Sequence, residues 1–108
     1  MSLPEVKISC SIVNASGQGV SGTLFISDHQ LVFKPSALMK ILVFWNKWTD
    51  LTIDIKHLVG YKKMMMGYIS LCLYDGSTYQ LNVFKKDILI HEINKRRVIN
   101  SYAELKAL

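Results

Sequence analysis

Apolar and polar residues alternate along most of this chain, which is the pattern of strands that bury one face. Turn-forming residues separate the alternating runs, and Asp75-Gly76 between two of them is typical of a tight hairpin. Proline lacks the backbone N–H that a sheet uses, so Pro35 is expected to end the third run. The pattern predicts about seven short antiparallel strands. They cover residues 6–12, 20–27, 30–34, 51–56, 59–64, 69–74 and 78–83.

Beyond Phe84 the spacing of apolar residues changes to that of a helix. Asp87 is a suitable N-cap residue, because its carboxylate can accept hydrogen bonds from the first free amides. We therefore predict an amphipathic helix that begins near Asp87 and lies on the sheet. The apolar residues on its inner side are Ile88, Leu89, Ile90 and Ile93.

The end of the chain does not continue this apolar stripe. Its apolar residues fall on nearly the opposite side of the same helical wheel, so a straight helix would not bury both sets. We expect the helix to break between Asn94 and Arg97, and Ser101 and Glu104 have the spacing of a capping box. Residues 98–108 are thus predicted to be a C-terminal helical extension. Its apolar side chains need this domain or a neighbouring chain to cover them: Val98, Ile99, Tyr102 and Leu105.

Composition indicates one globular domain, residues 1–108. The chain is 50% hydrophobic and 19% charged, and its 108 residues are enough for a single core. The inward positions of the predicted strands and helix should form that core. They are Leu24, Ile26, Leu31, Phe33, Ile53, Ile55, Leu71, Leu73, Leu81, Ile88, Leu89 and Ile93.

The hairpin at residues 22–33 also carries a family signature. It reads Gly, small, aliphatic, aromatic, aliphatic and Ser27, then two polar residues before Leu31-x-Phe33. This spacing resembles the signature hairpin of GRAM domains, a branch of the pleckstrin-homology-like superfold. Two later motifs fit: Ile53-x-Ile55-x-x-Leu58 resembles the family's fourth strand, and Leu73-Tyr74-Asp75-Gly76 followed by Tyr79-x-Leu81 resembles its last hairpin. The resemblance covers roughly residues 5–97. It implies a mainly β, half-open barrel whose C-terminal helix plugs one end.

The sequence offers little for catalysis or metal binding. Cys10 and Cys72 lack Cys-x-x-Cys spacing, and the three histidines have no fixed spacing to a nucleophile or a second acid. We predict a chain that is not an enzyme and needs no metal and no cofactor. The longest apolar run, Ile41 to Trp45, is far shorter than the roughly 20 residues of a membrane span. The first residues do not have the pattern of a signal peptide, so a cytoplasmic location is expected.

The connection at residues 36–49 is the first candidate site. Loops are usually polar, yet this one is strongly apolar and carries both tryptophans. Tryptophan beside lysine suits a lipid interface or a protein groove, and the resemblance implies that the family's ligand loops lie at this end. An extra strand or a cover over the barrel mouth remains the alternative. The candidate residues are Lys40, Phe44, Trp45, Lys47 and Trp48.

A second candidate is a basic patch made by the charges that give the chain its net +5. Such a patch favours anionic partners, although a solvated surface that keeps the protein soluble is the plain alternative. Nucleic acid is the least favoured partner, because no binding signature accompanies the charges. The patch consists of Lys62, Lys63, Lys85, Lys86, Arg96 and Arg97.

These features predict a non-catalytic adaptor module that works by surface contact. Charge and the Trp/Lys connection favour peripheral binding to an anionic membrane. The alternative is a scaffold for protein binding or for self-association as a homo-oligomer. It is favoured by the absence of basic residues in loop 14–19, by Met64-Met65-Met66 at a hairpin tip and by the apolar residues after Arg97. In lipid-binding pleckstrin-homology domains, the basic residues typically lie in that first hairpin.

Overall fold

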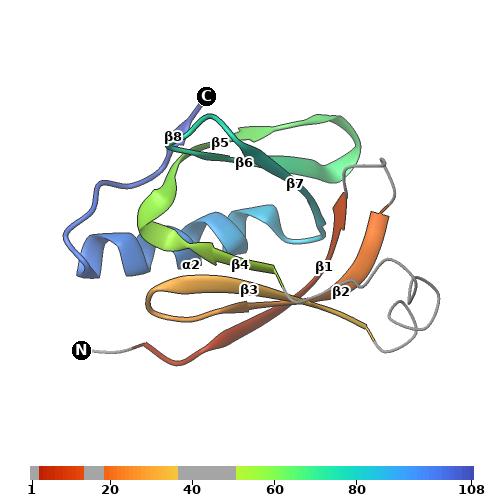
Figure 1. The fold of residues 1–108 in the computed structure, drawn as a ribbon, viewed down its shortest axis with the longest axis horizontal. Coiled ribbons are helices and arrows are strands. Elements are labelled where there is room, and N and C mark those ends of the chain that lie inside the picture. Colours follow the sequence, from red (N-terminus) through yellow and green to blue (C-terminus); the bar gives the residue numbers. More distant parts are fainter. Residues whose placement is uncertain (1–2, 14–18, 37–50) are drawn as a thin grey trace.

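The computed structural model describes residues 3–13, 19–36 and 51–108 (Figure 1). Its strands follow the order β4-β3-β2-β1-β7-β6-β5-β8 in one strongly bent sheet that does not close. All neighbours are antiparallel except β5 and β8. The elements are β1 Val6–Val13, β2 Gly19–Ile26, β3 Gln30–Pro35, β4 Leu51–Asp54, η2 Ile55–His57, β5 Leu58–Lys63, η3 Met65–Gly67, β6 Tyr68–Leu73, β7 Thr78–Val83, α2 Lys86–Ile99 and β8 Lys106–Ala107.

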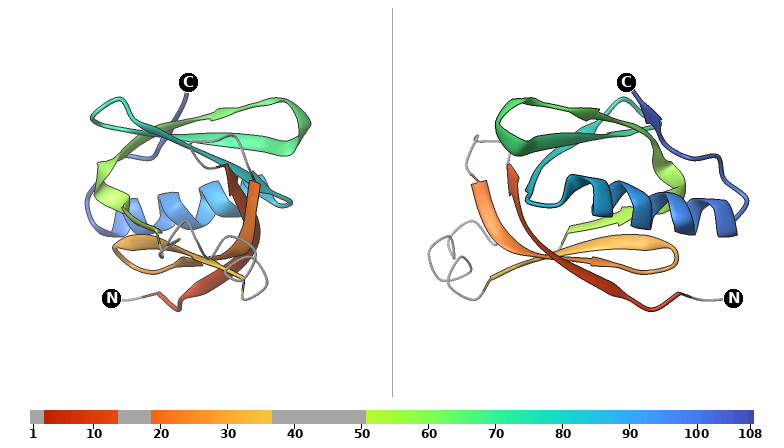
Figure 2. Two further views of the ribbon diagram at one scale, coloured as in Figure 1. Left: turned by 45° about the vertical axis from the view of Figure 1, so that its right-hand side comes forward. Right: turned by 180° about the vertical axis from the view of Figure 1, so that it is seen from behind.

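This arrangement confirms the expected mainly β, half-open barrel. Strands β1–β4 form one half and β5–β7 the other, and α2 lies between the two halves, as both views in Figure 2 show. Each predicted strand is present with nearly the predicted bounds. The fourth strand is shorter than expected, because the η2 turn begins at Ile55.

Alternation along each strand places the core between sheet and helix. Ten of the twelve predicted core residues are buried, and Leu73 is half-buried. Ile88 is the wrong prediction, since 45% of it is exposed. It lies in the first turn of α2, beyond the point where β1 and β7 separate, and among the described residues no strand covers it.

The predicted break in the helix is wrong: α2 runs without interruption from Lys86 to Ile99. The prediction counted only apolar residues as buried. In the structure, two charged residues, Arg96 and Arg97, continue the buried side of the helix after Ile93. Both are long side chains whose guanidinium groups find oxygen acceptors inside the protein. Among the described residues, no helix is long and apolar enough to cross a membrane.

The predicted second helix is also wrong, because Ser101 ends a helix and does not begin one. Its φ of 67° is left-handed. Its N–H donates to the carbonyl of Val98 (3.0 Å), and the N–H of Tyr102 donates to the carbonyl of Arg97 (2.7 Å). These two bonds form a Schellman motif, which satisfies the last free carbonyls of the helix. The chain then turns back along the barrel, so residues 98–108 are not a helical extension.

The chain after α2 ends as a strand on the edge of β5. Gly60 pairs with Lys106 and Tyr61 with Ala107 in parallel register, and the Leu108 N–H donates to the Tyr61 carbonyl (2.8 Å). Leu105 is buried in the core of this domain, so no other chain is needed to cover it. Val98, Ile99 and Tyr102 are exposed, and the prediction that a second surface covers them stays a prediction.

Candidate functional site

The first predicted site falls on residues that the structure leaves undescribed. Lys40, Phe44, Trp45, Lys47 and Trp48 all lie within 37–50, outside the described ranges. Their role as a ligand surface stays a prediction.

The lysines of the second predicted site gather partly around the start of α2. Lys63, the last residue of β5, binds Asp87 of the helix through Nζ and Oδ1 at 3.0 Å. The hydrogen bond with Asp87 and its negative charge raise the pKa of Lys63. Lys85 and Lys86 lie just before Asp87 in the chain. One carboxylate therefore offsets part of the positive charge at this end of the barrel.

The two arginines do not belong to that surface, and this part of the prediction is wrong. Arg96 and Arg97 are both buried. They lie at the far end of α2 from Lys85 and Lys86, on the side that faces the sheet. The sequence shows that two positive charges are present, but it does not show that main-chain carbonyl oxygens inside the fold accept hydrogen bonds from them.

Arg97 fastens the last part of the chain to the barrel. Its Nη1 donates to the carbonyls of Ile55 (2.9 Å) and Leu58 (2.7 Å), and its Nε donates to the carbonyl of Ala103 (2.7 Å). Its guanidinium carbon lies 5.7 Å from the centre of the Tyr102 ring. Burial lowers the pKa of Arg97, while Tyr102 opposes that shift. This arginine thus joins η2, β5 and the segment before β8.

Arg96 holds the opposite end of the chain. Its Nη2 donates to the Pro4 carbonyl at 2.6 Å, and its Nη1 binds a carboxylate oxygen of Glu92 at 2.6 Å. Burial alone would raise the pKa of Glu92, but hydrogen bonds from Arg96 and Lys95 outweigh it and hold that pKa below its ordinary value. The residues before β1 are therefore held against α2.

Between this attachment and the start of the helix lies a pocket of about 340 Å³. We call it the β1–α2 groove; it is lined by Val6, Lys7, Ile8, Ser9, Phe84, Lys85 and Ile88. Val6 and Ile8 face inward but are only half-buried, because nothing covers this part of the barrel among the described residues. Phe84 is 95% exposed, although a lone phenylalanine normally buries its ring.

Sequence reasoning missed the groove. Apolar residues alternate at Tyr79, Leu81 and Val83, and Phe84 breaks that phase immediately before Lys85. An aromatic residue out of phase at a strand end, followed by a basic pair, was the available signal. It did not say that β1 would lie beside Phe84, because that contact depends on strand order.

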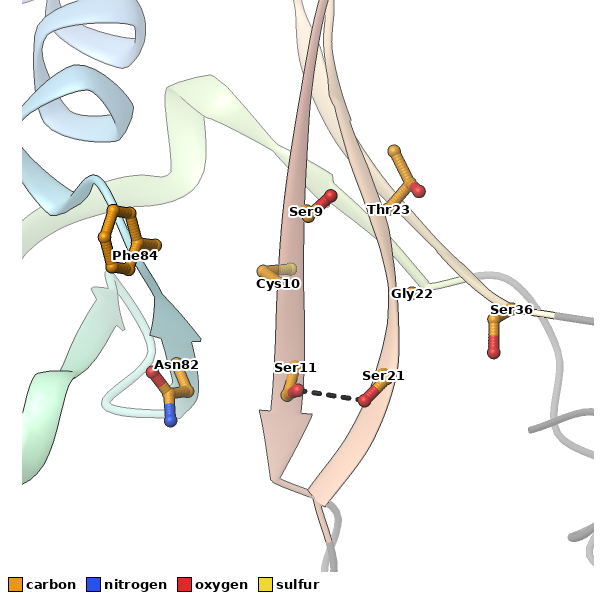
Figure 3. A pocket seen from close by; sticks show the side chains of 9 residues that line it. All are labelled: Ser9, Cys10, Ser11, Ser21, Gly22, Thr23, Ser36, Asn82 and Phe84. Atoms are coloured by element: carbon orange, nitrogen blue, oxygen red, sulfur yellow. Dashed lines mark hydrogen bonds between the residues drawn. The ribbon is translucent and has the colours of Figure 1, made fainter. Parts of the chain in front are cut away.

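A second, wider pocket of about 530 Å³ adjoins the groove and shares Ser9 and Phe84 with it (Figure 3). Hydroxyl groups face it from two strands, and Ser11 binds Ser21 across them (Oγ to Oγ, 3.2 Å). Burial raises the pKa of Cys10 to about 12, so this thiol stays protonated and unreactive at neutral pH. The pocket thus has polar walls but no activated nucleophile at Cys10.

No protein-family model matches the chain, and no curated protein matches its sequence. Solved structures do share its fold. The C-terminal domain of an unknown protein from Leishmania infantum has a TM-score of 0.67 at 16% identity, covering 90% of this chain and 85% of that one. The hSac2 domain from human phosphoinositide phosphatase Sac2 has a TM-score of 0.61 at 10% identity, covering 98% and 79%.

A chain of the Spt16D–Pob3N heterodimer has a TM-score of 0.65 at 11% identity. The match covers 98% of this chain but only 56% of that one, so the present chain is similar to little more than half of it. The heterodimer and hSac2 chains have pleckstrin-homology-like folds. Identities this low show the fold alone, so the superfold is supported, whereas membership of the GRAM branch stays a prediction.

Proposed function

We propose that this chain is a non-catalytic interaction module that binds a segment of a partner protein in the β1–α2 groove. The single observation that carries the proposal is the exposure of Phe84 and Ile88 beside the half-covered Val6 and Ile8. An uncovered apolar wall on a small domain costs stability in water, and a partner's apolar side chain offsets that cost. The protonated Cys10 thiol agrees with a binding role rather than covalent catalysis.

The positions of the charges favour a protein over a membrane. Burial of Arg96 and Arg97 removes two of the cations that a lipid surface would attract, and Asp87 offsets Lys63. A concave groove also suits a protruding chain better than a flat bilayer. The structural neighbours do not decide the matter, since one comes from a phosphoinositide phosphatase and another from a protein heterodimer.

Paired variants at the two ends of α2 test the proposal. Linear peptides are selected from a random display library on the wild-type protein, and their dissociation constants are measured by fluorescence polarisation. The double variant Phe84→Ser/Ile88→Ser should weaken binding by about tenfold or more, because it removes the apolar wall. Val98→Ser/Ile99→Ser is the matched control, since both residues are exposed at the other end of the same helix. Equal losses in the two variants, or unchanged binding in the first, would contradict the proposal.

A specific observation also favours peripheral membrane binding as a second candidate. Met65 is 86% exposed at the η3 tip, and Lys62 and Lys63 directly precede the three methionines of that tip. Exposed apolar side chains flanked by lysines suit an anionic interface. Flotation with phosphatidylcholine vesicles, with and without phosphatidylserine and at two salt concentrations, tests it. Binding that needs phosphatidylserine and falls with salt would support this candidate, and Trp45→Ala/Trp48→Ala would then report whether residues 36–49 contribute.

A further inference from the structure

The hydrogen bonds of the first hairpin reveal which way the main chain of β1 points. The Ser27 N–H donates to the Gln30 carbonyl and the Ser36 N–H donates to the Ser21 carbonyl, both at 3.0 Å. Along an antiparallel strand, main-chain groups point to alternate sides. Odd-numbered residues of β2 therefore bond to β3, and its even-numbered residues bond to β1.

The register carries this alternation into β1. Val6 pairs with Ile26 and Ile8 pairs with Leu24, so these two residues of β1 direct their main chain toward β2. Lys7, which lies between them, directs its N–H and carbonyl to the opposite side. That side is where β7 runs.

However, β7 does not reach Lys7. Its pairing with β1 covers only Ile12, Ser11 and Cys10, the last of which pairs with Val83. At Phe84 the chain leaves the sheet and turns into α2. In the described part of the chain, the main-chain groups of Lys7 therefore have no strand beside them. A central strand has an open edge at one of its ends, and the β1–α2 groove lies along that edge.

Main-chain groups and side chains at this edge suit an added strand. Lys7 offers one donor and one acceptor in the orientation that a β-ladder requires. Val6 and Ile8 on one wall and Phe84 and Ile88 on the other would receive alternate side chains of such a strand. Its path would continue the line that β7 leaves at Val83.

The charges at the open edge favour an acidic segment of a partner over a second copy of this chain. Lys7 and Lys85 both line the groove. Glu5 is two residues from Lys7 and Asp87 is two residues from Lys85, but Asp87 already pairs with Lys63. A second copy of this chain added antiparallel through the same edge would bring two Lys7 residues close together, which is unfavourable. An acidic segment gains attraction from both lysines.

We propose that an extended, acidic segment of a partner protein adds to the open edge of β1 as an antiparallel strand, bonding to the main chain of Lys7. The proposal rests on the proposed function and adds the conformation and charge of the partner. Main-chain pairing supplies the register, and the groove selects apolar residues at alternate positions of the segment.

The test uses peptides with alternating apolar and Glu residues, each carrying one N-methyl group at a successive position. A methyl group removes one main-chain donor. Lys7 has one carbonyl at the open edge, so the peptide methylated at the amide opposite that carbonyl should lose about tenfold in affinity, the value of one hydrogen bond. The peptides methylated at the two neighbouring amides, which point away from the edge, are the matched controls. Equal losses at all positions, or no loss at any position, would overturn strand addition. If those peptides still depended on Phe84, the proposed function would stand, whereas binding that is independent of Phe84 would contradict both.

Amide hydrogen exchange provides an independent readout. Peptide binding should slow exchange at Lys7 by about tenfold or more and leave Ile8 unchanged, because Ile8 already bonds to β2. Lys7→Glu should weaken binding of the acidic peptide, whereas Lys56→Glu, an exposed control in η2, should not. Slow exchange at Lys7 in the free protein that is lost on dilution would assign the edge to a second copy. Slowing by anionic vesicles alone would assign it to a membrane. Either result would overturn the proposal.

Discussion

Two edges of the same bent sheet differ: one is covered by a later segment of the chain, and the other is open. At β5, the residues after α2 return and pair with the edge through Gly60 and Tyr61. At the beginning of β1, β7 turns away at Phe84, so that among the described residues Lys7 pairs with β2 on one side and has no strand on the other. Uncovered edges invite pairing with other chains, so proteins normally cover or charge them. Here one edge is covered and the other is flanked by lysines and an apolar wall.

The difference lies in what holds each edge. Arg97 supplies hydrogen bonds to η2, to Leu58 and to Ala103, so the covered edge is fastened by a buried cation. Near the open edge, Arg96 donates to the Pro4 carbonyl, which lies beyond the end of the strand. The edge closed by its own chain serves stability, whereas the open, charged edge is where we propose that a partner segment adds.

Removing the buried cation should have the largest effect. Arg97→Met leaves the carbonyls of Ile55 and Leu58 buried without their donor, and we expect the free energy of unfolding to fall by about 3 kcal/mol. Denaturant titration measures this. Lys95→Met, an exposed change on the same helix, should alter the value by less than about 0.5 kcal/mol. Similar losses in both variants would contradict the role of Arg97.

Acid should weaken the attachment near the open edge by a smaller amount, because Arg96 keeps its bond to Pro4. The pKa of Glu92 is lower in the folded protein than its unfolded value of about 4.3, so its contribution is complete above that pH. As the pH falls through the folded value, that stability is lost. Glu92→Gln does not titrate, so its unfolding free energy should depend less on pH below about 4.3. Parallel curves for both proteins would refute this.

A side chain at Gly60 should open the covered edge. A Cβ there would meet the Lys106 carbonyl oxygen at 2.8 Å and Leu108 at 3.0 Å. We expect Gly60→Ala to release β8, to speed amide exchange at residues 106–108 and to cost about 1 kcal/mol. Gly19→Ala is the control, since a Cβ there meets nothing within 4 Å. Unchanged exchange at β8 would show that the backbone accommodates the methyl group.

The smallest effect is a gain in stability at the end of α2. Ser101 has a φ of 67°, which glycine adopts without strain. Ser101→Gly should therefore raise the free energy of unfolding by about 0.5 to 1 kcal/mol. Ser101→Ala keeps the Cβ atom and should bring no gain. A gain in both variants would point to loss of the hydroxyl instead.

The strands were predictable because their alternation reflects local burial, as at Leu24, Ile26, Leu31 and Phe33. The end of α2 was not predictable. Arg96 and Arg97 can be buried because carbonyl groups of distant segments accept their hydrogen bonds, and a helical wheel does not include those segments. Two residues of β8 are too few to show alternation. The open edge at Lys7 depends on where β7 ends relative to β1, a property of tertiary pairing.

The pairing of β1 with β7 has a consequence for folding during synthesis. Ile12 pairs with Leu81, and Arg96 reaches Pro4 across 92 residues of sequence. Of the described strands, β1 is synthesised first, and its second neighbour, β7, is available only after β2 to β6 have been made. Such long-range contacts slow folding, because loop closure precedes the gain from pairing. In a nascent chain β1 would have β2 as its early neighbour, so this strand is where a chaperone would give most protection.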